Sequence, residues 1–136
     1  NIAKKLLRDL NFKNCLDVGC ASGFMISEIA KSYPKAQYFG IDVYDKAIEY
    51  AKVKYPHIKF FHAAAEKMPY KDNNFDLIIS YETIEHVKDP ESFLFEIRRL
   101  LKTRTSFLNL LILRDSLTTT IHKKLILKRK EKRLDE

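Results

Sequence analysis

Residues 16–23 are Leu16-Asp17-Val18-Gly19-Cys20-Ala21-Ser22-Gly23. The apolar residues before the first glycine suit a buried strand, and the two glycines permit backbone angles and close approaches that a Cβ would forbid. Ser22 is placed to cap a helix that begins near Phe24, whose amino end would present free N–H groups. This corner between a strand and a helix predicts a site for a nucleotide-like ligand, although a tight turn without a ligand has the same pattern.

A second strand-like run, residues 37–43, carries an acidic residue near its end. Asp42 follows Gly19 at close to the spacing of about 20 residues that a βαβ unit uses for the carboxylate that binds ribose hydroxyls. The alternative role for Asp42 is to cap the next helix, for which Asp45 is better placed. The pairing of a glycine turn with this carboxylate favours a bound nucleoside.

Composition limits the class of protein. The chain has 136 residues, of which 46% are apolar and 32% charged, as expected for one globular domain. Because the sequence has neither an apolar run long enough to span a bilayer nor a signal core, we expect a cytoplasmic protein. Cys15 and Cys20 lie in the first strand and its turn, so they are expected to be reduced thiols.

Most of the net charge of +7 lies at the carboxyl end. Residues 121–136 hold seven Lys or Arg and three Asp or Glu. A basic helix with Ile121, Leu125 and Ile126 along one edge would suit a peripheral contact with an anionic membrane, or nucleic acid. The alternative is a solvated terminal helix, which is the commoner role of a charge run.

The remaining sequence alternates between helical and strand-like patterns. Helices are expected at residues 2–10, 23–31, 45–54 and 90–102, with Phe24 and Ile26 or Ile29 buried in the second of them. Strands are expected before the glycine turn and at residues 37–43, 58–62, 75–80 and 107–113. This order predicts an α/β fold, a Rossmann-like, mostly parallel twisted sheet flanked by helices. Residues 1–113 would form the ligand-binding domain and residues 114–136 a basic tail.

Four segments together resemble the class I S-adenosylmethionine-dependent methyltransferases of the type 11 group. They are residues 16–23, 40–43, 65–70 and 72–76, and the resemblance covers residues 12–102. It implies that the glycine turn wraps the methionine part of the cofactor, through Asp17, Gly19, Cys20, Ala21 and Gly23. It also implies that Asp42 holds the ribose, and that the adenine side of the site is formed by Val43, Ala65 and Glu66, with Tyr81 at the end of the fourth strand.

The sequence departs from the family pattern at several places. Ala21 replaces the middle glycine of the turn, and Ala64 stands where an Asp often bonds the adenine amino group. Residues 103–106 replace the usual Pro-Gly-Gly turn, and no sixth or seventh strand is recognisable after Leu113. We therefore expect a sheet truncated after its fifth strand, for one of three reasons: the chain is a fragment, its end has diverged, or a partner or an oligomer covers the exposed edge.

A dinucleotide-binding oxidoreductase is the main competing interpretation, because it uses the same corner. It would need a third glycine for close packing of helix and strand beside the pyrophosphate. The turn has the pattern Gly-x-x-x-Gly without that residue, and the segment after the third strand matches methyltransferases instead.

The segment after the fourth strand carries candidate chemistry. In a helical turn Glu82, Glu85 and His86 would share one face, and two carboxylates with an imidazole suit Mg²⁺. The pattern resembles the metal-binding segment of O-methyltransferases of ubiquinone biosynthesis and of RNA enzymes that methylate a terminal ribose 2′-hydroxyl. The alternative is that both glutamates face solvent and His86 packs in its loop or acts as a general base.

These observations predict an S-adenosylmethionine-dependent methyltransferase that methylates a hydroxyl of a small-molecule acceptor. Two other functions fit the same residues. One is a non-catalytic methyltransferase-like module that binds a partner through the basic tail, and the other is RNA 2′-O-methylation.

Overall fold

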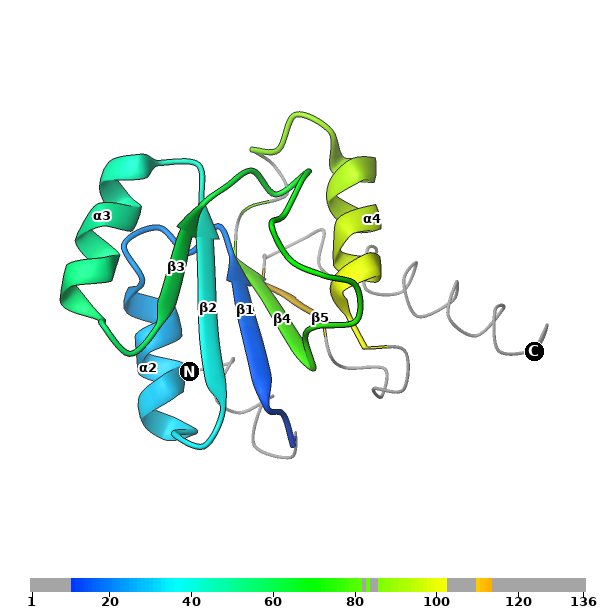
Figure 1. Cartoon of the computed structure of the whole chain (residues 1–136). Coiled ribbons are helices and arrows are strands. Elements are labelled where there is room, and N and C mark those ends of the chain that lie inside the picture. The colour runs from blue at the N-terminus through cyan, green and yellow to red at the C-terminus, as the bar shows by residue number, and fades with distance from the viewer. Residues whose placement is uncertain (1–10, 82, 84–85, 103–109, 114–136) are drawn as a thin grey trace.

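The computed structural model of the chain describes residues 11–81, 83, 86–102 and 110–113 (Figure 1). Within these residues a single sheet holds five strands in the order β3-β2-β1-β4-β5. The strands are β1 (Asn14–Val18), β2 (Gln37–Asp42), β3 (Lys59–His62), β4 (Leu77–Tyr81) and β5 (Leu110–Leu113). The helices between them are α2 (Phe24–Ser32), α3 (Asp45–Lys54) and α4 (Pro90–Leu100).

All four strand pairs are parallel, and β1 lies at the centre of the sheet. From β1 the chain builds outward to β2 and β3 on one side, then returns to place β4 and β5 on the other. Asp17 of β1 is thus level with Gly40 of β2 and with Ile79 of β4. A ligand crevice is expected at the carboxyl end of a strand where the order reverses in this way.

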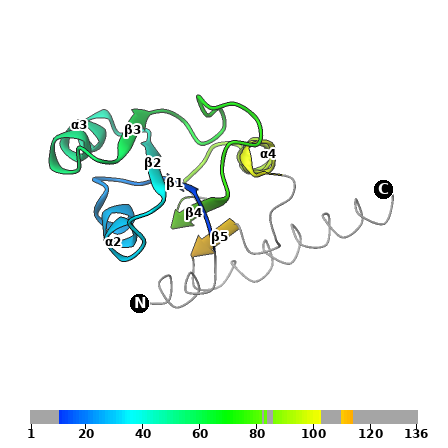
Figure 2. The ribbon, with the colours of Figure 1, turned by 60° about the horizontal axis from the view of Figure 1, so that its bottom comes forward.

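Two apolar layers hold helices against the two faces of the sheet, as Figure 2 shows. On one face α2 and α3 pack through buried Ile26, Ile29, Ile48 and Ala51. On the other face α4 packs through Phe93, Ile97 and Leu100. This arrangement, together with the parallel sheet, confirms the predicted Rossmann-like α/β class.

The helix starts differ from expectation in two of three cases. Asp89 caps α4 by accepting a hydrogen bond from the Ser92 amide at 3.2 Å, and Pro90 follows as predicted. The expected Ser22 cap of α2 is wrong, because Gly23 in a left-handed conformation is the N-cap and no side chain bonds there. The expected Asp45 cap of α3 is also wrong, since Tyr44 is the N-cap and Asp45 bonds the adjacent Lys46 amide.

Burial corrects one further prediction. Phe24, expected in the core, is 66% exposed, and Ile26 and Ile29 are buried instead. The reason is that Phe24 opens α2 directly after the turn, where its side chain points away from the sheet face that Ile26 and Ile29 cover. The expected helix at residues 2–10, the turn at 103–106 and the basic tail at 114–136 all lie outside the described residues. Among the residues described, no helix has the length and apolarity needed to cross a membrane.

Candidate functional site

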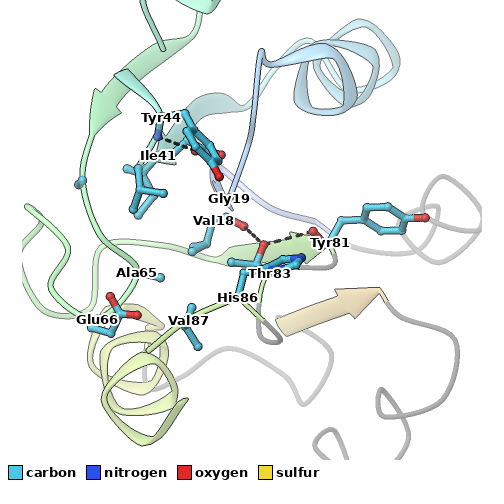
Figure 3. A pocket seen from close by; sticks show the side chains of 13 residues that line it. Val18, Gly19, Ile41, Tyr44, Ala65, Glu66, Tyr81, Thr83, His86 and Val87 are labelled. Atoms are coloured by element: carbon cyan, nitrogen blue, oxygen red, sulfur yellow. Dashed lines mark hydrogen bonds between the residues drawn. The ribbon is translucent and has the colours of Figure 1, made fainter. Parts of the chain in front are cut away.

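A cavity of about 470 Å³ opens at the carboxyl ends of β1, β2 and β4, within the size range of small-molecule sites. Its position matches the crevice expected where the strand order reverses. The residues described along it are Val18, Gly19, Ile41, Asp42, Val43, Tyr44, Ala63, Ala65, Glu66, Tyr81, Thr83, His86 and Val87 (Figure 3).

The turn after β1 is fixed by hydrogen bonds to the end of β2. The amides of Gly19 and Cys20 both donate to the Ile41 carbonyl at 2.9 Å. Gly19, Ala21 and Gly23 have φ values of 77°, 48° and 86°, so three residues of this short turn adopt left-handed conformations. Ala21 is therefore strained, because a residue with a Cβ occupies a left-handed conformation in which glycine has a lower energy.

Thr83 lies directly against the first glycine. Its hydroxyl is 2.9 Å from the Val18 carbonyl and 3.2 Å from the Tyr81 carbonyl (Figure 3). A Cβ on Gly19 would come within 2.2 Å of that hydroxyl, so Gly19 is required by its neighbour as well as by its φ. Sequence reasoning missed Thr83; the signal available was a β-branched hydroxyl residue just past the strand that adjoins β1.

Asp42 connects the turn after β1 to the end of β2, the strand in which Asp42 is the last residue. One carboxylate oxygen accepts a hydrogen bond from the Ala21 amide at 2.8 Å, and the other accepts one from the Tyr44 amide at 2.9 Å. Each oxygen has a further lone pair, so the carboxylate can still accept hydroxyl groups from a ligand. Its orientation toward the pocket is fixed by backbone donors before any ligand arrives.

Asp17 is a buried carboxyl at the centre of the sheet. It is fully buried in β1, and neither of its oxygens has a hydrogen-bond partner among the residues that the structure describes. Burial, and secondarily the Asp42 charge, raises its pKa to about 7. Burial, and secondarily the charges of Asp17 and Asp42, raises the pKa of the Cys20 thiol. Because burial favours the neutral form of Asp17, a positive charge bound nearby would favour its ionised form.

The loop after β3 forms the opposite wall. Ala65 is buried, and Glu66 accepts a hydrogen bond from the Lys88 amide at 3.1 Å. This bond ties the wall to the segment that leads into α4. Ala64, the position where an acidic residue often bonds adenine in the family, makes a short bridge with Lys67.

Tyr81 and His86 line the far side of the cavity, and both are exposed. The ring of Tyr81 points away from the other labelled side chains in Figure 3, whereas His86 lies beside Thr83. The His86 amide donates to the Thr83 carbonyl at 3.0 Å, closing a turn after β4. This turn places an imidazole at the cavity next to the first glycine.

The charges along the cavity have one sign. Its described lining residues include two carboxylates, Asp42 and Glu66, one imidazole and no Lys or Arg. The field of these two carboxylates in the cavity favours a cationic ligand over an anionic one.

The predicted site residues divide into three groups. Those along the cavity are Gly19, Asp42, Val43, Ala65, Glu66, Tyr81 and His86. Those that build or underlie the turn, without being among its described lining residues, are Asp17, Cys20, Ala21 and Gly23. Glu82 and Glu85, two of the three proposed Mg²⁺ ligands, lie outside the described residues, and within the described part of the chain no three His, Cys, Asp or Glu form a metal-binding cluster. The metal site stays a prediction.

The chain matches known proteins over this region. The family model described as "Methyltransferase domain" matches residues 16–108. A fatty-acid O-methyltransferase of Mycolicibacterium smegmatis is 28% identical over 102 residues, which are 74% of this chain and 37% of that protein. A norajmaline N-methyltransferase of Rauvolfia serpentina is 36% identical over 94 residues, covering 65% of this chain and 32% of that protein.

Among solved structures, an S-adenosylmethionine-dependent methyltransferase of Aquifex aeolicus superposes with a TM-score of 0.63 at 28% identity. The match covers 74% of this chain and 58% of that one. The chain thus spans about a third of the length of the two sequence relatives. It belongs to the methyltransferase domain family of type 11, as the four sequence segments predicted.

Proposed function

We propose that this domain binds S-adenosylmethionine and transfers its methyl group to a hydroxyl of a small molecule. The observation that supports this best is the cavity at the carboxyl ends of β1, β2 and β4, with two carboxylates and no Lys or Arg among its described lining residues. S-Adenosylmethionine carries a sulfonium and an ammonium, so it suits this field. A dinucleotide would bring an anionic pyrophosphate to a wall without cations.

The residues of the cavity also suit the shape of this cofactor. In the proposed binding mode, Asp42 accepts the ribose hydroxyls with its remaining lone pairs, and Ile41, Val43 and Ala65 provide an apolar slot for adenine. The methionine part would lie along the turn at Gly19, with the buried Asp17 carboxyl behind it. Glu66 remains a candidate for the adenine side or for the ammonium group.

When bound, the cofactor supplies an electrophilic methyl group on a positively charged sulfur. Much of the rate then depends on holding an acceptor oxygen in line with the methyl carbon, which is the work of the cavity walls. His86 is the one imidazole among the described lining residues, and we assign to it the proton that the acceptor hydroxyl loses.

The acceptor is proposed as a small molecule because the cavity is of small-molecule size. The relatives named above methylate an oxygen in one case and a nitrogen in the other, according to their names. We favour oxygen because a hydroxyl needs the base that His86 provides, whereas a neutral amine attacks without one. Two alternatives remain: RNA 2′-O-methylation, which rests on the Glu82, Glu85 and His86 pattern, and a non-catalytic binding role, which rests on the basic tail.

Calorimetry tests the proposal directly. The full chain is titrated with S-adenosylmethionine and, separately, with its demethylated product, and saturable heat is expected for both. His86→Gln should keep cofactor binding and lose most of the turnover with any acceptor found in a cell extract. A folded protein that gives no heat at millimolar ligand would overturn the proposal. Cofactor binding without methylation of any extract component would instead favour the non-catalytic module.

A further inference from the structure

Arg99, on the last turn of α4, reaches out of its helix into the loop between β3 and β4. Its guanidinium donates to the Tyr70 carbonyl at 2.7 Å and to the Met68 carbonyl at 3.2 Å. It also pairs with Asp72 at 2.9 Å. Figure 1 shows this loop running beside α4. Three residues of the loop thus bond to the Arg99 side chain.

Glu96 completes the contact from the same face of α4. It binds Arg99 through both carboxylate oxygens, at 2.7 Å and 2.8 Å, and also accepts the Met68 amide at 2.8 Å. Glu96 is buried, and the hydrogen bonds from Arg99 lower the pKa of its carboxyl despite that burial. The Glu96 carboxylate is thus largely shielded from water, the Arg99 side chain is half-buried, and two parallel bonds join them in the geometry in which an ion pair orients its neighbours.

The backbone at the end of α4 holds the other end of the loop. The Arg99 carbonyl accepts the Asn73 amide at 2.9 Å, and the Leu100 carbonyl accepts the amides of Asn74 and Phe75. These carbonyls have no partner within the helix, so they are free to bind the loop. At the opposite end of α4, Glu66 accepts the Lys88 amide, just before the helix cap.

The loop is thus held by contacts with both ends of α4. Ala65 and Glu66, which lie near the start of this loop, form a wall of the cavity. We propose that Arg99 is a positioning residue for the cofactor site, which holds this wall in place without touching the ligand. The proposal rests on the proposed cofactor binding. It accounts for an arginine here, because two carbonyls and two carboxylates need several donors in one plane, which a lysine ammonium does not offer.

The test compares Arg99→Gln and Arg99→Lys with Arg98→Gln, which changes an exposed arginine of the same helix turn. Calorimetry at a temperature where circular dichroism shows every variant folded gives the dissociation constant for S-adenosylhomocysteine. We expect a rise of about tenfold or more for Arg99→Gln, a smaller rise for Arg99→Lys and less than twofold for Arg98→Gln. A dissociation constant unchanged in folded Arg99→Gln overturns the proposal.

A second readout separates positioning from general stability. S-Ribosylhomocysteine lacks the adenine, so the ratio of its dissociation constant to that of S-adenosylhomocysteine reports what the adenine side of the site contributes. We expect this ratio to fall in Arg99→Gln and to stay constant in Arg98→Gln. Equal weakening of both ligands means a merely structural role and overturns the proposal.

A third readout needs no ligand. Hydrogen exchange of the Met68 and Asn73 amides should be faster in Arg99→Gln, with amides of β1 and β2 unchanged. If the unmodified protein binds no S-adenosylhomocysteine, the proposed function fails, and this exchange result alone shows whether Arg99 orders the loop. Unchanged exchange rules out Arg99 as the residue that orders it.

Discussion

Asp42 accepts a hydrogen bond from the backbone amide of Ala21, with 2.8 Å between the carboxylate oxygen and the nitrogen. The bond joins the turn after β1 to the end of β2, two segments that both border the cavity. Since the second oxygen of Asp42 accepts the Tyr44 amide, the side chain has one fixed orientation. A residue predicted as a ligand contact is therefore also part of the framework of the site.

Replacement of Asp42 by Ala should weaken both the fold and ligand binding. The amides of Ala21 and Tyr44 lose their partners in a partly buried position, so we expect a loss of about 1–3 kcal/mol in the free energy of unfolding. Urea denaturation measures this loss, and calorimetry should show at least tenfold weaker cofactor binding. Asp45→Ala, which changes an exposed neighbour, is the control and should alter neither quantity much. Equal stability of the two variants would contradict the role of Asp42 in the framework.

Replacement of Ala21 by Gly should stabilise the protein. Ala21 has a φ of 48°, and a left-handed conformation costs a residue with a Cβ about 1–2 kcal/mol, partly offset by the greater freedom of glycine in the unfolded chain. A rise in the thermal midpoint is expected. The control Ala47→Gly lies inside α3, where glycine is unfavourable, and its midpoint should fall. A fall in both variants would show that Ala21 is not strained.

Gly19 and Thr83 should behave as a coupled pair. Gly19→Ala places a methyl group within 2.2 Å of the Thr83 hydroxyl and adds backbone strain, so we expect a loss of several kcal/mol in stability. Thr83→Ala removes the nearest atoms, and the double variant should be more stable than the two single losses predict. A coupling energy of about 1 kcal/mol or more in the urea-derived cycle is expected. Strictly additive losses would mean that the two side chains do not compete for the same space.

Stability should depend on pH through Asp17. Its pKa is about 7 in the folded protein against an ordinary value of 3.8, so between these values the folded state holds a proton that the unfolded state has lost. Asp17 therefore favours folding most at low pH, and its contribution falls as pH rises from about 4 to about 7 and is then constant. Asp17→Asn cannot ionise, so its stability relative to the unmodified protein should rise over that range by a few kcal/mol.

The control for Asp17 is Asp76, whose pKa moves the other way. Partial burial opposes ionisation of Asp76, but the amides of Asn14 and Lys13 and the Lys102 ammonium outweigh it and lower its pKa. Its contribution is present above pH 4 and is lost as pH falls through its folded pKa. The loss in Asp76→Asn should accordingly shrink with acidification. Thermal midpoints from about pH 2 to about pH 8 measure both variants, and a difference for Asp17→Asn that stays constant with pH would contradict the prediction.

Local sequence patterns predicted the fold and the first residues of the cavity, whereas Val43, Ala65 and Glu66 were predicted through the family resemblance. The spacing of apolar residues predicted α3 with the bounds that the structure gives it, Asp45–Lys54, and Pro90 correctly predicted the start of α4. Gly19 and Asp42, predicted from the βαβ pattern, lie along one cavity because parallel strands end at the same edge of a sheet. These features depend on short-range chemistry that each segment carries by itself.

The features that were missed depend on partners distant in sequence. Nothing near Thr83 indicates that it fills the space above Gly19, and nothing near Arg99 indicates that its partners include carbonyls of the loop after β3. The Glu96 and Arg99 pair was visible as two opposite charges three residues apart, but such pairs are usually exposed and of little effect. Burial and the loop contacts change its role, and both are set only by the folded chain.

The central position of β1 has a consequence for the whole molecule. On one side β1 pairs with β2, which pairs with β3, and on the other side β1 pairs with β4, which pairs with β5. The cavity has lining residues from both of these parts of the chain. A ligand in the cavity would act as a reversible cross-link between the two parts. If the chain were cut in the loop after β3, pairing of β1 with β4 would still join the two fragments, and the ligand should strengthen their association.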